Sequence, residues 1–238
     1  MTAPILEVQE LESGYGEVQV LWGVSLHVQA GRLTTLVGAN GAGKTTTLRT
    51  IMSSVRPWRG RVLLNGEDVT RLSPHAKAAR GLVLVPEGRQ LFPDMTVEEN
   101  LQMGAYASRA RQKQKENLAR VFDVFPRLKE RRKQRSSSLS GGEQQMLAMG
   151  RGLMQEPAVL MIDELSLGLA PVLAQQLLLN LKSLRDQGLT IILVEQNVHL
   201  ALALSDYTYV MAQGRFTIQG ESRMIAKMKE VRRAYMGL

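Results

Sequence analysis

The sequence contains no cysteine, which excludes a disulfide framework, a thiol nucleophile and a cysteine-ligated metal. It has no uncharged apolar run long enough to span a bilayer, and residues 1–7 lack the basic and apolar regions of a secretory signal. We therefore expect any role at a membrane to depend on a partner protein. The 238 residues suffice for one large domain with a real core, or for a domain with a subdomain.

Outside one segment, acidic and basic residues balance. The net charge of the whole chain is +8, and residues 109–135 alone hold eleven Lys and Arg against three Asp and Glu. Such a segment could bind nucleic acid or an anionic membrane surface, or it could be a solvated helix face. A nucleic-acid site is expected to interleave basic residues with aromatic ones. Only Phe122 and Phe125 lie inside this segment.

The clearest pattern is the stretch 38–45, GANGAGKT, which matches the phosphate-binding loop G-x-x-x-x-G-K-[ST]. It follows an apolar run at 33–37 and leads into a helix-like run at 46–52. Glycines let backbone N–H groups approach phosphate oxygens, and the helix N-terminus adds its dipole. Lys44 can reach the β- and γ-phosphates, and the Thr45 hydroxyl can bind Mg²⁺. The alternative is a glycine-rich turn that binds nothing. The expected nucleotide contacts in this stretch are Gly38, Asn40, Gly41, Ala42, Gly43, Lys44, Thr45 and Thr46.

A second pattern, 139–145, reads LSGGEQQ. Ser140 and Glu143 form a capping box at the start of a predicted helix. Gly141 and Gly142 then occupy its first turn, where each costs about 1 kcal/mol relative to alanine. So unfavourable a pair suggests that another group approaches this backbone closely, and an anion is the obvious candidate.

A third pattern is the apolar strand 158–164, AVLMIDE, which ends in two carboxylates. Downstream of a P-loop, such a strand is typical of the Mg²⁺-holding strand of a P-loop NTPase. Asp163 would hold the metal. Glu164 would point the opposite way along the strand, where it could polarise an attacking water. The alternative is a strand that ends at a solvated acidic pair.

The coarse secondary structure predicts an α/β fold with an N-terminal antiparallel β part and an inserted helical subdomain. Strand-like runs at 5–11 and 18–28 flank a turn with Tyr15, whose ring could stack on a purine or be an ordinary turn tyrosine. Asn65 and Gly66 predict a type I′ hairpin. A capping box at Thr96 opens a helical stretch that we expect to run to about Arg135.

The three patterns together resemble the nucleotide-binding subunit of an ABC transporter, and the resemblance covers essentially the whole chain. It implies one ABC ATPase domain over 1–238, with a P-loop NTPase (RecA-like/β) core at 1–86 and 157–238 and a helical subdomain at about 87–156. Four further runs are similar to one ATPase of branched-chain amino-acid importers, with urea and amide importer ATPases as the nearest competitors. These runs are 85–89, 95–101, 166–171 and 194–197.

The resemblance implies a head-to-tail dimer, of two copies or of one copy and a paralogue, with two ATP molecules between the subunits. Each ATP would lie between one P-loop and the Ser140, Gly141 and Gly142 of the other subunit. Tyr15 would stack on adenine, and Glu164 would orient the water for attack. Polytopic permease subunits would bind the chain at the cytoplasmic face of the inner (plasma) membrane, with a solute-binding protein acting indirectly and no nucleic acid involved.

Three positions depart from the general family pattern. Glu87 stands where most members have a glutamine that contacts Mg²⁺ and water, so it would bind the metal, be protonated or turn away. Gln196 stands where most have a histidine at the γ-phosphate, and it can donate a hydrogen bond but no positive charge. Leu165 replaces a proline and loosens its turn. We therefore expect Glu164, Gln196 and Lys44 to act in catalysis, and Thr45, Asp163 and Glu87 to surround the metal.

A different class, a soluble ABC-type ATPase acting on nucleic acid, is suggested by the basic segment. Against it stand the single ATPase domain, the absence of a long coiled coil, and the absence of zinc-binding cysteines. A GTPase is not expected, because the sequence has no N-K-x-D base-reading motif. The residues do not identify a transported solute.

Overall fold

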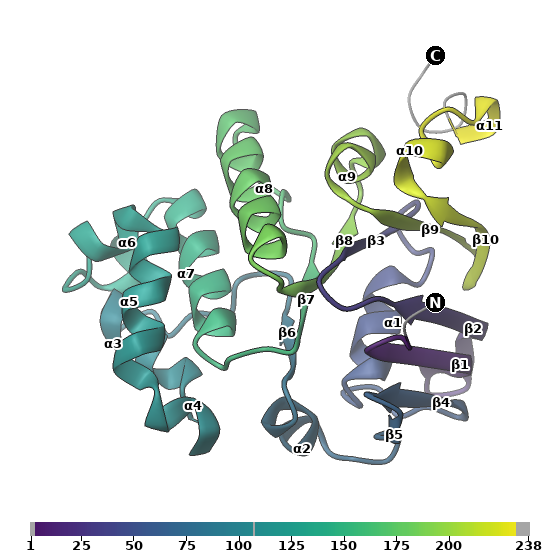
Figure 1. Cartoon of the computed structure of the whole chain (residues 1–238), viewed down its shortest axis with the longest axis horizontal. Coiled ribbons are helices and arrows are strands. Elements are labelled where there is room, and N and C mark those ends of the chain that lie inside the picture. The colour runs from purple at the N-terminus through teal and green to yellow at the C-terminus, as the bar shows by residue number, and fades with distance from the viewer. Residues whose placement is uncertain (1–2, 107, 232–238) are drawn as a thin grey trace.

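The computed structural model describes residues 3–106 and 108–231, and it contains two sheets packed beside a group of helices (Figure 1). The antiparallel sheet has the order β2-β1-β4-β5. Its strands are β1 (Leu6–Tyr15), β2 (Val18–Val28), β4 (Arg59–Leu64) and β5 (Glu67–Asp68). This sheet confirms the expected antiparallel N-terminal part.

The second sheet has the order β10-β9-β3-β8-β7-β6, in which the first pair is antiparallel and the other neighbours are parallel. Its strands are β3 (Leu33–Val37), β6 (Leu82–Val85), β7 (Val159–Asp163), β8 (Thr190–Glu195), β9 (Tyr207–Ala212) and β10 (Arg215–Glu221). The interior strands β3 and β7 are buried at every residue, because both of their faces are covered. Because β3, β8 and β7 are parallel neighbours, their carboxyl ends meet at one edge of the sheet.

The helices that precede α7 in the chain are short. They are α1 (Lys44–Ile51), α2 (Pro74–Ala79), α3 (Val97–Gly104), α4 (Ser108–Gln112), α5 (Gln114–Val124), α6 (Pro126–Glu130) and the 3₁₀ turn η1 (Ser136–Ser138). The later ones are α7 (Gly141–Leu153), α8 (Pro171–Asp186), α9 (Val198–Leu204), α10 (Ser222–Ile225) and α11 (Lys229–Val231). In the described chain, no helix combines the length and the apolar composition needed to cross a membrane.

Side chains of β7 alternate between two hydrophobic cores. Leu160 and Ile162 pack into a core shared with helices α3 to α8, whereas Val159 and Met161 pack into one shared with α1 and the antiparallel sheet. The parallel sheet therefore separates the helical group from the antiparallel sheet, as Figure 1 shows.

Two predictions of local structure need correction. The described residues of the stretch 96–135 form not one long helical run but four helices, α3 to α6, because Pro126 cannot continue α5 and the chain turns after Gly104. Its two ends meet, since Thr96 and Arg135 form a β-bridge. The first strand extends to Tyr15, so the turn before β2 consists of residues 16–17.

The predicted caps and the hairpin are confirmed. Thr96 and Ser140 each form a reciprocal capping box with the glutamate three residues later. Asn65 and Gly66 have φ values of 52° and 78°, as a type I′ turn between β4 and β5 requires.

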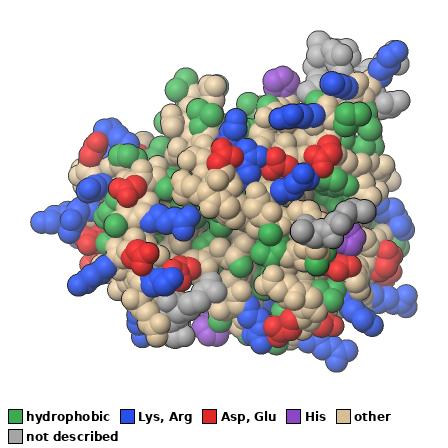
Figure 2. Space-filling view, viewed as in Figure 1, with side chains coloured by type: hydrophobic (Ala, Val, Ile, Leu, Met, Phe, Trp, Pro, Cys, Tyr) green, Lys and Arg blue, Asp and Glu red, His purple; other side chains and the backbone are tan. Residues whose placement is uncertain are grey.

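The basic segment is partly neutralised within the chain. Figure 2 shows Lys and Arg side chains among acidic ones at the end of the molecule formed by α3 to α6. Arg132 pairs with Glu98 at 3.1 Å, and Arg131 pairs with Glu143 at 2.7 Å. These pairs favour the solvated-face interpretation for this part of the segment.

Candidate nucleotide site

The P-loop occupies the turn between β3, in the middle of the parallel sheet, and α1. Gly38 is required by close packing, because a Cβ atom there would lie 2.2 Å from the carbonyl oxygen of Met211. Gly43 caps α1 with φ at 107°, a left-handed conformation that favours glycine. The sequence-predicted strand, loop and helix are therefore present, and the loop directs its backbone toward the carboxyl edge of the sheet.

Lys44 is the buried cation of this loop, with only 4% of its surface exposed. Its Nζ donates hydrogen bonds to the carbonyl oxygens of Gly38 at 2.9 Å and Ala39 at 3.1 Å. These neutral carbonyls orient the ammonium but do not balance its charge. An anionic phosphate within the loop would balance it.

Thr45 and Asp163 form the centre expected for a metal. The Thr45 Oγ1 donates to Oδ1 of Asp163 at 3.0 Å. Burial, together with the nearby carboxylates of Glu87 and Glu164, raises the pKa of Asp163 to about 6 against the lowering effect of this hydrogen bond. A hydroxyl and carboxylates are the oxygen donors that Mg²⁺ prefers, and the cation would favour the ionised Asp163. Among the described residues no group of three or more His, Cys, Asp and Glu could hold a metal alone, so Mg²⁺ would also need phosphate oxygens and water.

Glu87 follows β6 and Pro86 and is paired with a residue that the sequence analysis missed. Its Oε1 lies 3.0 Å from Nη2 of Arg49, on α1. This pair offsets the repulsion that a carboxylate beside phosphates would suffer. The two residues are 38 positions apart, and only the contact between α1 and the β6 loop reveals the pairing.

The backbone at Glu164 differs from the prediction. β7 ends at Asp163, and Glu164 has φ at 51°, so it does not continue the strand's alternation. Its N–H donates to the carbonyl oxygen of Val194 at 3.0 Å, which holds the residue beside the end of β8. The left-handed turn therefore orients this residue, and strand geometry does not.

These groups surround one pocket of about 470 Å³. It is lined by Val20, Asn40, Gly41, Gly43, Lys44, Thr45, Thr46, Glu87, Glu164, Leu167 and Gln196. The structure thus brings the P-loop together with Glu87, Glu164 and Gln196, and with Asp163 through Thr45. Tyr15, at the end of β1, does not line this pocket and is 46% exposed.

The segment 140–142 also lies outside that pocket; all three of its residues are described, and none lines it. Ser140 caps α7, and the Cβ position of Gly142 lies 2.8 Å from Leu173 of α8. The Cβ position of Gly141 lies 3.2 Å from Arg89. A Cβ atom at either glycine would meet only the ends of flexible side chains, so packing inside the chain does not by itself require this glycine pair.

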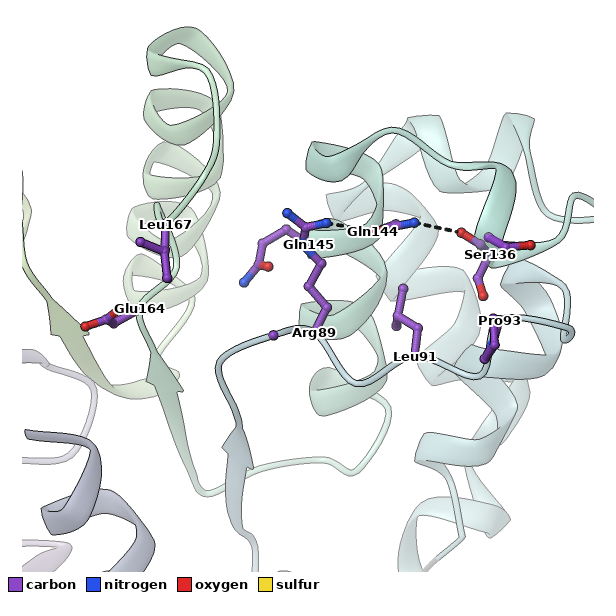
Figure 3. Close-up of a pocket in the computed structure, with 10 residues that line it drawn as sticks. Arg89, Leu91, Pro93, Ser136, Gln144, Gln145, Glu164 and Leu167 are labelled. Atoms are coloured by element: carbon purple, nitrogen blue, oxygen red, sulfur yellow. Dashed lines mark hydrogen bonds between the residues drawn. The ribbon is translucent and has the colours of Figure 1, made fainter.

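A second cavity, of about 420 Å³, separates these two regions. In Figure 3, Glu164 and Leu167 lie on one side of it, and Arg89 and Gln144 lie on the other. Arg89 donates to Oε1 of Gln144 at 2.8 Å, and Gln144 donates to the carbonyl of Ser136 at 3.2 Å. The loop after β6 is thereby tied to the first turns of α7.

Comparison with known proteins identifies the family. Residues 21–166 match the family model described as ABC transporter. The chain belongs to this family. It is an ATPase of the ABC type, and the resemblance stated from the sequence and the α/β P-loop fold are both confirmed.

Full-length relatives and solved structures agree with this assignment. The chain is 42% identical to the high-affinity branched-chain amino acid transport ATP-binding protein BraG of Pseudomonas aeruginosa, over 98% of this chain and 100% of the relative. It is 36% identical to the probable branched-chain amino acid transport ATP-binding protein LivF of Archaeoglobus fulgidus, over 98% and 99%. The ADP conformation of MJ1267, an ATP-binding cassette of an ABC transporter, superposes with a TM-score of 0.84, 28% identity and full coverage of both chains.

Proposed function

We propose that this ABC ATPase energises an importer of branched-chain amino acids. The observation that carries the proposal is the pocket in which the P-loop, the Thr45–Asp163 pair and Glu164 converge. The solute class is supported by the names of the two relatives at 42% and 36% identity, each covered over nearly its full length.

The charged side chains of the site, together with Thr45 and Gln196, have chemical roles in the proposal. Lys44 would bind the terminal phosphates, and Thr45 and Asp163 would hold Mg²⁺, which would neutralise charge on the phosphates. Glu164 would accept a hydrogen bond from the attacking water and orient it in line with the γ-phosphate. Gln196 would donate a hydrogen bond to that phosphate. Arg49 would keep Glu87 from repelling it.

The remaining predicted contacts belong to the assembled complex. Ser140, Gly141 and Gly142 would bind the ATP held by a partner's P-loop, and Tyr15 would stack on adenine. ATP favours the closed dimer, and hydrolysis releases it, which would move permease subunits docked near the helical subdomain, 87–156. The chain would then lie at the cytoplasmic face of the membrane, without nucleic acid.

The test is the variant Glu164→Gln, with Glu116→Gln on the exposed surface of α5 as its control. We expect Glu164→Gln to bind ATP as the parent does, to lose at least about a hundredfold in kcat, and to accumulate a dimer with ATP in size-exclusion chromatography. The control should match the parent in all three measurements. Parental turnover in Glu164→Gln would refute the water-orienting role.

The solute class is tested in the reconstituted transporter. Leucine with its binding protein should stimulate ATP hydrolysis, whereas stimulation by urea or an amide instead would assign the chain to the competing importer class.

A further inference from the structure

Glu195, the last residue of β8, is a buried carboxylate to which the proposed mechanism gives no role. Its side chain is 2% exposed. Oε1 accepts the backbone N–H of Ser166 at 2.9 Å, and Oε2 accepts the Ser166 hydroxyl at 2.7 Å. The backbone N–H of Gln196 also donates to this carboxylate. All of these partners are donors, as an ionised, acceptor-only carboxylate requires.

A carboxylate at this position is unfavourable unless it holds something in place. Burial raises the pKa of Glu195 above its ordinary value, and the nearby charge of Glu164 adds to the rise. Removing a charged group from water is costly unless its lone pairs are satisfied. The donors from Ser166 and Gln196 supply that compensation, and in return their backbones are fixed to the end of β8.

The segment held in this way carries the proposed water-orienting group. Ser166 follows Glu164 by two residues, and the Leu165 side chain between them is fully buried. Glu164 is attached to the same strand through the carbonyl of Val194. A pocket of about 460 Å³ has Glu164, Ser166, Glu195 and Gln196 in its lining. The carboxylate therefore connects the backbones that position Glu164 and Gln196.

We propose that Glu195 is a positioning residue for ATP hydrolysis. By accepting two hydrogen bonds from Ser166, it fixes Glu164 and Gln196 relative to each other. The inference rests on the proposed function, specifically on the role of Glu164. Among the described residues, Glu195 forms no hydrogen bond or ion pair with Lys44 or with the Thr45–Asp163 pair, so the contacts of the P-loop and the metal with the nucleotide should not depend on it. Misplacement of the Glu164 carboxylate by about 1 Å is enough to slow the in-line attack of water greatly.

The experiment compares Glu195→Ala, Glu195→Gln and Ser166→Ala in the full chain, measuring kcat, the KM for ATP and the thermal unfolding midpoint. We expect Glu195→Ala to lose at least about tenfold in kcat while its KM stays within about twofold of the parent. Glu195→Gln should keep kcat within about threefold, because its amide oxygen still accepts the Ser166 N–H. Ser166→Ala removes only the hydrogen bond from the Ser166 hydroxyl. It should fold normally and should lose about threefold in kcat.

Asp206→Asn is the matched control. This carboxylate also accepts a backbone N–H, that of Leu33, and a side-chain donor, Arg185, but at the opposite end of β3 from the P-loop. It should lower the unfolding midpoint without changing kcat.

Parental kcat in Glu195→Ala or in Ser166→Ala overturns the inference. If Glu195→Gln is as slow as Glu195→Ala, the inference is also overturned, because the charge of Glu195 and not its hydrogen bonds to Ser166 would then matter. Failure of the proposed function looks different, since Glu164→Gln itself would then hydrolyse ATP at the parental rate.

Discussion

Lys77 of α2 is a buried ammonium whose protonation should make stability depend on pH. Its side chain is 0% exposed, and its Nζ donates to the carbonyl of Ile51 at the end of α1. Burial lowers the pKa of Lys77 to about 8 from 10.5, against the opposing charge of Asp68. Between these two pH values the unfolded chain binds more protons than the folded one, so the lysine becomes less costly to bury as the pH rises.

We predict that the free energy of unfolding of the parent, minus that of Lys77→Met, is flat below about pH 7. It should then rise between about pH 8 and 10.5 by at most about 1.4 kcal/mol per pH unit. Urea unfolding at several pH values measures this difference, in which the titrations of all other groups cancel. An equal difference at pH 7 and at pH 10 would contradict the prediction.

At the residue scale, the sequence predicts the role of a residue when the whole motif lies in one stretch of chain. It does not predict the role of a residue whose hydrogen-bond or ion-pair partner is distant in the sequence. Lys44 and Thr45 follow from the P-loop alone. Arg49 lies on α1 beside that loop, yet its role depends on Glu87, which only the packing of β6 brings near. Glu195 was unmarked for the same reason, since its partner Ser166 is 29 residues away. A buried carboxylate has no sequence pattern of its own.

At the element scale, α7 is the helix on which the helical group packs. The Cβ position of Gly150 lies 2.8 Å from Leu101 on α3 and 2.9 Å from Val121 on α5. Glycine in a helix costs about 1 kcal/mol, so propensity alone would favour alanine there. Overpacking a tight core costs about 1–3 kcal/mol, and the β-branched Val121 has little rotamer freedom with which to yield.

We therefore predict that Gly150→Ala destabilises the chain by about 1 kcal/mol, as the overpacking cost exceeds the propensity gain. Urea unfolding measures the change. Gln175→Ala, on the exposed face of α8, tests propensity without packing and should change the free energy by less than about 0.5 kcal/mol. A net gain in stability for Gly150→Ala would contradict the prediction.

Elements with strong local signals were predicted and those set by tertiary contacts were not. The capping boxes at Thr96 and Ser140 and the hairpin at Asn65 are local, and all are confirmed. The division of the described residues of 96–135 into α3 to α6 was missed, although Pro126 is a local signal for the break between α5 and α6. The left-handed Glu164 was missed because its bond to Val194 comes from the neighbouring strand.

For the whole molecule, the sequence predicted the layers and the family, but its spacing could not separate the regions of the site. The P-loop is 96 residues from Ser140 by position, counted from Lys44, and either a shared or a split pocket was compatible with that. The structure places Lys44 in the 470 Å³ pocket and leaves Ser140 outside it. None of the pockets of 420, 460 and 470 Å³ described above is lined by both Lys44 and Ser140.

This separation has a kinetic consequence. If each catalytic unit needs two molecules, the rate per milligram should fall on dilution, because a second-order encounter precedes every turnover. We predict that specific ATPase activity of the purified chain rises with concentration and then levels off, and that covalent tethering of two copies abolishes the dependence. Serial dilution at saturating ATP measures it, and activity strictly proportional to concentration would contradict the prediction. In a cell, permeases that hold two copies side by side would provide such a tether. A chain that is not bound to permeases would then hydrolyse little ATP.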